Sequence, residues 1–245
     1  FFRDLNNNLT EIENIINYDS EYLEFKQKMI GFSDKINERE MLLKYNISAL
    51  KKQSFKKEIN KKSQRIEITK DTLFKGEVIF GENTEVVISP GVNVMMDSAL
   101  LKIKGKFKAV GTEKFPIIFN GIGKSGTIYF ENNDQVDISF VSFKNLSNQN
   151  SKQTQPSSVT FHNSKNINIT YSKFERNIVG DDFINFFKSS NVLIKECLFK
   201  DIKSDALDSD FSEIKIINSK FINIGNDAID GSGSNIFIKN CYFNN

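Results

Sequence analysis

Two patterns of apolar residues divide the chain. Up to about residue 64, apolar side chains recur at helical spacing, as in Leu23, Met29, Met41 and Tyr45. From Ile66 onward the period is two, because apolar and polar residues alternate in short runs separated by turn signals. The pattern predicts a mostly helical N-terminal segment or cap over residues 1–65 and an all-β region over residues 66–245.

An internal repeat organises the β region. Its copies superimpose without gaps, and an earlier copy spans Val136–Phe143; the four later ones are Ile167–Phe174, Val192–Phe199, Ile214–Phe221 and Ile236–Phe243. The Phe residues that close these four copies are 25, 22 and 22 positions apart. A repeat of about 22 residues that cannot bury its own apolar face indicates a solenoid, in which each copy is one coil.

Stacking of these coils places like side chains over one another. The repeat aligns two inward columns: Ile169, Ile194, Ile216 and Ile238 in one, and Phe174, Phe199, Phe221 and Phe243 in the other. Leucine-rich and ankyrin solenoids need a helix in each repeat, and left-handed β-helices favour strict hexapeptides; neither pattern occurs. We therefore predict a right-handed, single-stranded parallel β-helix over residues 66–245. Because the chain begins with Phe1 and ends inside a patterned segment, we expect it to be truncated at the C-terminus.

The same alignment places both cysteines in one column. Cys197 and Cys241 lie two coils apart, at about 4.8 Å per coil, so their Cα atoms exceed the separation of about 7 Å that a disulfide tolerates. The sequence predicts two free thiols.

The opening coils resemble a known family. The segments Val78–Val92, Leu101–Thr112 and Phe115–Phe119 look like the first coils of bacterial right-handed β-helix proteins of the pectate-lyase-like superfold. The resemblance covers residues 66–245. In that family such coils often precede repeats described as carbohydrate-binding and sugar-hydrolase coils. The resemblance is specific for the fold, and it implies an activity on polysaccharides only by analogy of fold.

Three consecutive coils share an acidic element: Asp182–Asn185, Asp205–Asp208 and Asp227–Asp230. Its first positions align Asp182, Asp205 and Asp227, and its last positions align Asn185, Asp208 and Asp230, with Asp181 and Asp210 close by. Residues i and i+3 of a strand point to opposite faces, so we expect the two columns in different environments unless a turn separates them. At most one column should then line a groove.

Stacked carboxylates suggest two kinds of chemistry. An oxygen-rich site without histidine suits Ca²⁺, and the candidate ligands are Asp181, Asp182, Asp205, Asp208, Asp227 and Asp230. Closely spaced carboxylates can also act as acid and base on a glycosidic bond, which makes Asp205, Asp227, Asp208 and Asp230 the catalytic candidates. The alternative is that the first Asp of each element caps a turn through hydrogen bonds to backbone N–H groups.

A second resemblance concerns the last coil. The stretch Asn226–Asn240 is similar to a segment of polygalacturonases, in which paired acids precede Gly-Ser-Gly-Ser and the next strand. The Gly-His-Gly and Arg-x-Lys motifs of those enzymes are absent from the 245 residues, as is the Asp-Pro-His-Glu signature of mannuronan epimerases. Calcium-dependent lyases use an Arg or Lys base beside clustered acids, for which Arg176 is the candidate. No catalytic role is carried over.

Composition narrows the partners. The formal charge of +2 provides no field to attract nucleic acid, and no apolar run approaches the length of a membrane span. His162 is the only histidine, which excludes a histidine-based metal cluster, and its neighbours indicate a turn residue.

Two functional hypotheses follow. The first is a monomeric extracellular or envelope β-helix that binds an acidic polysaccharide, or cleaves it as a lyase or glycoside hydrolase, through Asp182, Asp205, Asp227 and Arg176. It needs no cofactor in one version and uses Ca²⁺ in the other. The second is a non-catalytic spacer or adhesin module.

Overall fold

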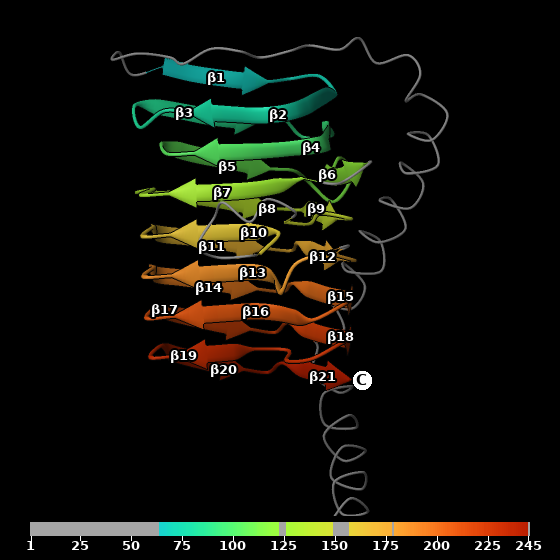
Figure 1. The fold of residues 1–245 in the computed structure, drawn as a ribbon, viewed down its shortest axis with the longest axis vertical. Coiled ribbons are helices and arrows are strands. Elements are labelled where there is room, and N and C mark those ends of the chain that lie inside the picture. The colour runs from blue at the N-terminus through green and yellow to red at the C-terminus, as the bar shows by residue number, and fades with distance from the viewer. Residues whose placement is uncertain (1–63, 123–125, 149–156, 178, 245) are drawn as a thin grey trace, which may run out of the picture.

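The described part of the chain is a parallel β-solenoid. The computed structural model describes residues 64–122, 126–148, 157–177 and 179–244, and the regular structure in them is entirely β-strand. The helical segment predicted before residue 64 lies outside these residues. The solenoid has about seven coils at a spacing of about 23 residues, and Figure 1 shows them descending from β1 to the C-terminal end. The prediction of stacked coils is confirmed.

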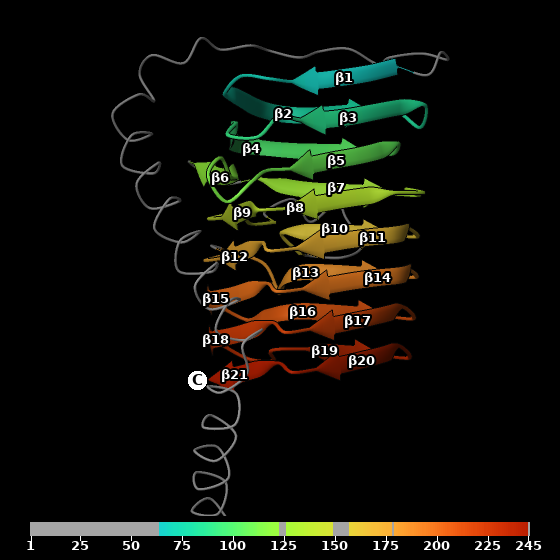
Figure 2. The ribbon, with the colours of Figure 1, turned by 180° about the vertical axis from the view of Figure 1, so that it is seen from behind.

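Each complete coil contributes a strand to three stacks. The first stack is an eight-stranded sheet, which Figure 2 shows from its own side: β1 (Gln64–Ile68), β3 (Thr84–Ile88), β5 (Lys106–Val110), β8 (Val136–Ser139), β11 (Lys165–Thr170), β14 (Ser190–Lys195), β17 (Glu213–Ile217) and β20 (Asn235–Lys239). The other two stacks belong to one thirteen-stranded sheet, because the long strands β2 (Thr72–Phe80) and β4 (Asn93–Ile103) cross both. The first part of β4 pairs with β6 and its last part pairs with β7.

The two branches of the larger sheet then separate. The second stack contains β6 (Ile117–Ile122), β9 (Val141–Lys144), β12 (Lys173–Glu175), β15 (Leu198–Ile202), β18 (Lys220–Ile224) and β21 (Tyr242–Asn244). The third stack contains β7 (Thr127–Glu131), β10 (Val159–His162), β13 (Asp182–Phe187), β16 (Asp205–Asp210) and β19 (Asp230–Ser232).

The core consists of the columns that the repeat predicts. Phe199 pairs in register with Phe174 and with Phe221, and the ring centroids are 4.8 and 4.6 Å apart. The Ile column follows the same register from β11 to β20. Burial of each such side chain contributes about 1.5–3 kcal/mol to the free energy of unfolding. At the last coil Ile238 and Phe243 are each 45% exposed, so the ladder ends there with its core side chains half uncovered.

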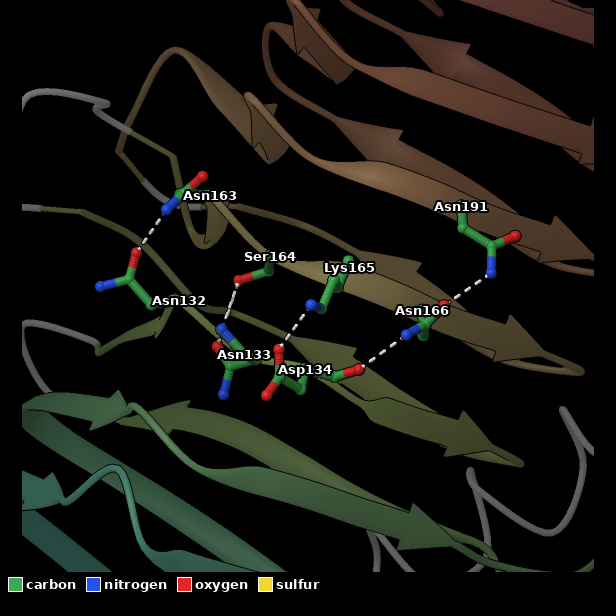
Figure 3. Close-up of polar contacts among 8 residues, drawn as sticks. All are labelled: Asn132, Asn133, Asp134, Asn163, Ser164, Lys165, Asn166 and Asn191. Atoms are coloured by element: carbon green, nitrogen blue, oxygen red, sulfur yellow. Dashed lines mark hydrogen bonds and ion pairs between the residues drawn. The ribbon is translucent and has the colours of Figure 1, made fainter.

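Polar ladders run along the corners of the coils. Many corner residues have positive φ, a conformation that asparagine tolerates better than most residues. Figure 3 shows one such corner, where the Asn163 amide donates to Asn132 over 2.7 Å and the Asn191 amide donates to Asn166 over 2.7 Å. In the same view Lys165 pairs with Asp134 at 3.0 Å. These contacts bind neighbouring coils together outside the core.

The cysteines occupy a second corner column, with Ser172 and Ser219. Both thiols are free, as predicted. The Cys197 sulfur lies 3.4 Å from the carbonyl oxygen of Lys195, and its backbone N–H donates to the hydroxyl of Ser219 over 3.2 Å. The small side chains of this column therefore form hydrogen bonds that stabilise the corner of the coil.

The two thiols should differ in reactivity. Burial raises the pKa of the Cys197 thiol to about 12, whereas Cys241 is only partly buried. Because the thiolate is the reactive species, we expect maleimide to label Cys241 slowly in the native protein and Cys197 only after unfolding. Mass spectrometry of digested samples measures both, and equal labelling of the two thiols in the native protein would contradict this assignment.

Candidate functional site

The acidic element of the repeat lies on the third stack. Asp182 pairs in register with Asp205, and Asn185, Asp208 and Asp230 follow one another across β13, β16 and β19. The structure thus contains the two columns that the alignment of the repeats predicts. We call the following set the acidic surface: Asp181, Asp182, Asp205, Asp208, Asp210, Asp227 and Asp230.

The expectation that the two columns have different environments is wrong. Phe183 and Ile184, the two residues between Asp182 and Asn185, both belong to the buried core, and the Phe183 ring packs edge-on against Phe174 at 5.7 Å. Two consecutive inward residues break the alternation of a strand. Asp182 and Asn185 therefore lie on the same outer side of the coil, although both belong to the single strand β13 and no turn separates them.

Burial and mutual repulsion perturb the carboxylates. Burial, and then the charges of Asp208, Asp181, Asp205 and Asp210, raise the pKa of Asp182 to about 8. Burial and the charge of Asp210 also raise the pKa of Asp208 to about 6, which the hydrogen bond from Asn185 partly opposes. In the described part of the chain, none of the seven carboxylates of the acidic surface forms an ion pair with Lys or Arg. Among the described residues, the groups that stabilise their charge are hydrogen-bond donors and not cations.

Two groups of these acids have the dimensions of a cation site. One carboxylate oxygen each from Asp181, Asp182 and Asp205 lie within 4.8 Å of one another, and the same holds for Asp205, Asp227 and Asp230. Two oxygens bound to one Ca²⁺ at about 2.4 Å are separated by at most about 4.8 Å. Both groups therefore fit a hard cation, and Asp205 belongs to both.

Some of the acids also stabilise turns. The Asp227 N–H donates to Asp205 Oδ1 over 2.8 Å, and the Gly231 N–H donates to Asp230 Oδ1 over 2.6 Å. The first contact joins one coil to the next and the second is local, and both are the hydrogen bonds to backbone N–H groups that the alternative interpretation expects. Neither contact uses the second oxygen of its carboxylate.

A buried amide lies among the acids. Asn185 is 1% exposed, and its Nδ2 donates to Asp208 Oδ2 over 2.6 Å and more weakly to Asp210 Oδ2 over 3.4 Å. Its Oδ1 has no hydrogen-bond partner in the described structure. A buried acceptor without a donor costs about 1–3 kcal/mol, so this atom favours a ligand that brings a donor.

Aromatic rings flank the acidic surface on the same face. The His162 ring, at the end of β10, stacks between Tyr129 at 6.1 Å and Phe187 at 5.2 Å, and Phe187 meets the 63% exposed Phe211 edge-on at 6.2 Å. We call these four residues the aromatic row. Sequence reasoning missed it because only the register of β10 with β13 aligns His162 with Phe187 of a later coil.

Arg176 lies apart from this arrangement. It occupies a corner after β12, with φ of 55°. Burial lowers the pKa of Lys144 to about 7, the charge of Glu175 opposes this, and the charge of Arg176 adds a smaller lowering effect. It makes no ion pair with the acidic surface among the described residues. Its part in ligand binding stays a prediction.

Comparison with known proteins provides no identification. No protein-family model matches this chain, and no curated protein matches it. The interpretation of the acidic surface thus depends on its geometry. Among the residues that the structure describes, no helix has the length and apolar character needed to cross a membrane.

Proposed function

We propose that the chain is a right-handed β-helix that binds a polysaccharide along the acidic surface, in the extracellular space or cell envelope. The sense of winding supports the handedness. Strands of the third stack run leftward on the near side in Figure 1, and those of the first stack run leftward when seen from behind in Figure 2, while the chain descends. A chain that turns clockwise as it recedes forms a right-handed coil.

One observation carries the proposed binding function, namely seven carboxylates on one outer face without a basic partner in the described residues. Purely structural acids are normally compensated, because uncompensated charge costs stability. The aromatic row beside them includes the 63% exposed ring of Phe211, an apolar surface against which a pyranose ring can pack. Coils spaced by about 4.8 Å present one set of these groups for each sugar unit of an extended glycan along the axis.

The proposal also includes cleavage of the bound polysaccharide by the same acids. Asp208 is half-buried with a pKa of about 6, so it is partly protonated near neutral pH, as a general acid must be. Asp205, Asp227 and Asp230 provide carboxylates close enough to act with one another. Both hydrolysis and elimination release reducing ends from a bound polymer, and only elimination also gives unsaturated products, which therefore distinguish the two reactions.

A glycan array tests binding. We expect the parent to bind at least one class of polysaccharide, and Asp205→Asn and Asp227→Asn to bind at least tenfold more weakly, because each removes one charge that both cation and sugar contacts would use. Arrays with and without Ca²⁺ reveal any bridging ion. Asp137→Asn, on the outer face of β8, is the matched control.

Asparagine keeps the oxygen that accepts from the Asp227 N–H, so Asp205→Asn should retain the turn. Circular dichroism and urea unfolding verify this. If no glycan binds the parent, or if both variants bind as the parent does, the acids are turn residues and the spacer or adhesin function stands.

A further inference from the structure

The acidic surface offers a ligand mainly acceptors. An ionised carboxylate accepts hydrogen bonds and donates none, and the unpartnered Oδ1 of the buried Asn185 is likewise an acceptor; only the acids with a raised pKa, Asp182 and Asp208, can carry a proton to donate. The donors of Asn185 are already directed at Asp208 and Asp210. A ligand that satisfies this surface must therefore bring donors and positive charge.

The basic groups on the same face are already engaged. Lys102 and Lys104 at its N-terminal end both pair with Glu131, at 3.0 and 3.1 Å. The Lys188 ammonium lies 5.2 Å from the centroid of the Phe187 ring. An anionic glycan would meet repulsion here unless metal ions bridged it, and the Lys188 contact demonstrates that a ring of the aromatic row accommodates an ammonium group.

We propose that the acidic surface recognises a cationic glycan, a polymer of amino sugars with free ammonium groups, without a bridging metal ion. This inference rests on the proposed polysaccharide-binding function and specifies its substrate class. An ammonium has three donors and no acceptor, the complement of a carboxylate column.

The register explains why a polymer suits the site better than a single amine. Asn185, Asp208 and Asp230 follow one another in three consecutive coils. The carboxylates of Asp208 and Asp230 lie on neighbouring coils, about 4.8 Å apart along the axis, so a glycan that carries several ammonium groups can bring more than one of them to this surface at once. The sugar rings then lie beside Phe187 and Phe211, which border the column.

Calorimetric titration tests the charge of the ligand directly. The probes are a hexamer of β-linked glucosamine and its fully N-acetylated counterpart at pH 6 with a chelator, together with oligogalacturonate plus Ca²⁺. We expect the glucosamine hexamer to bind at least tenfold more tightly than the acetylated one and to lose affinity as NaCl is raised. The double variant Asp208→Asn, Asp210→Asn should weaken this binding at least tenfold, whereas Asp137→Asn should not.

The other outcomes separate the two proposals. Equal affinity for the two hexamers, or binding of oligogalacturonate with Ca²⁺ alone, overturns the cationic substrate class and leaves polysaccharide binding intact. Failure of all three probes, together with an array on which no glycan binds, overturns both. Unchanged affinity of a correctly folded double variant assigns the binding to another surface and also overturns the inference.

Discussion

Replacing Phe199 by alanine should lower the free energy of unfolding by about 3–5 kcal/mol, the range for truncating a fully buried aromatic residue. Phe199 is fully buried between Phe174 and Phe221, so the change removes two stacked contacts and leaves a cavity in the middle of the ladder. Because each coil contacts only its neighbours, the damage should concentrate in the adjoining coils. Urea unfolding measures the total, and hydrogen exchange locates it.

Phe243 provides the matched control for this substitution. It lies in the same column on the last coil, two coils from Phe199, and stacks on Phe221 at 5.0 Å. It is 45% exposed, and in the described structure a ring packs on one side of it only. Phe243→Ala should cost clearly less than Phe199→Ala. Equal losses of stability would mean that neither the burial of Phe199 nor its second stacked ring decides the cost, and would contradict the prediction.

The Phe column was predictable because an exact repeat leaves little freedom of register. A slip of one residue would turn every inward Ile and Phe outward, so the alignment of Phe174, Phe199 and Phe221 specifies the pairing of their strands. The acidic residues share this register, which is why their columns also follow from the sequence.

The direction of the acidic side chains required the structure. Simple alternation assigns Asp182 and Asn185 to opposite faces, but Phe183 and Ile184 both enter the core. The signal was present in the sequence as two consecutive apolar residues in every copy, Phe183-Ile184, Ala206-Leu207 and Ala228-Ile229. It could not be interpreted from the sequence, because a regular strand directs only one of two consecutive residues into the core.

The aromatic row had no comparable signal. Tyr129, His162 and Phe187 come from coils of unequal length, and their chemistry differs from one coil to the next. A repeat search detects positions that stay alike, whereas a ligand-binding face depends on positions that change. This difference explains why the fold was easier to predict than the site.

Replacing Asp182 by asparagine should stabilise the protein at pH 8 by up to a few kcal/mol and have little effect at pH 4. The folded-state pKa of about 8 lies far above the value of about 3.9 expected for an unfolded chain. Between these values the folded protein holds a proton that the unfolded chain has released. The stability associated with Asp182 is therefore complete below about pH 4 and declines as the pH rises toward 8, by at most about 1.4 kcal/mol per pH unit.

Asparagine resembles the protonated acid and cannot ionise, so this decline should disappear from the variant. Urea unfolding at half-unit pH intervals, in buffer with a chelator, measures the free energy of unfolding against pH. The control variant Asp137→Asn should show the same pH dependence as the parent. Parallel curves for Asp182→Asn and the parent would mean that Asp182 is ionised at neutral pH and that another group compensates its charge. A stabilised variant that also binds glycans more weakly would instead show that the acidic surface sacrifices stability for function, as residues retained for binding commonly do.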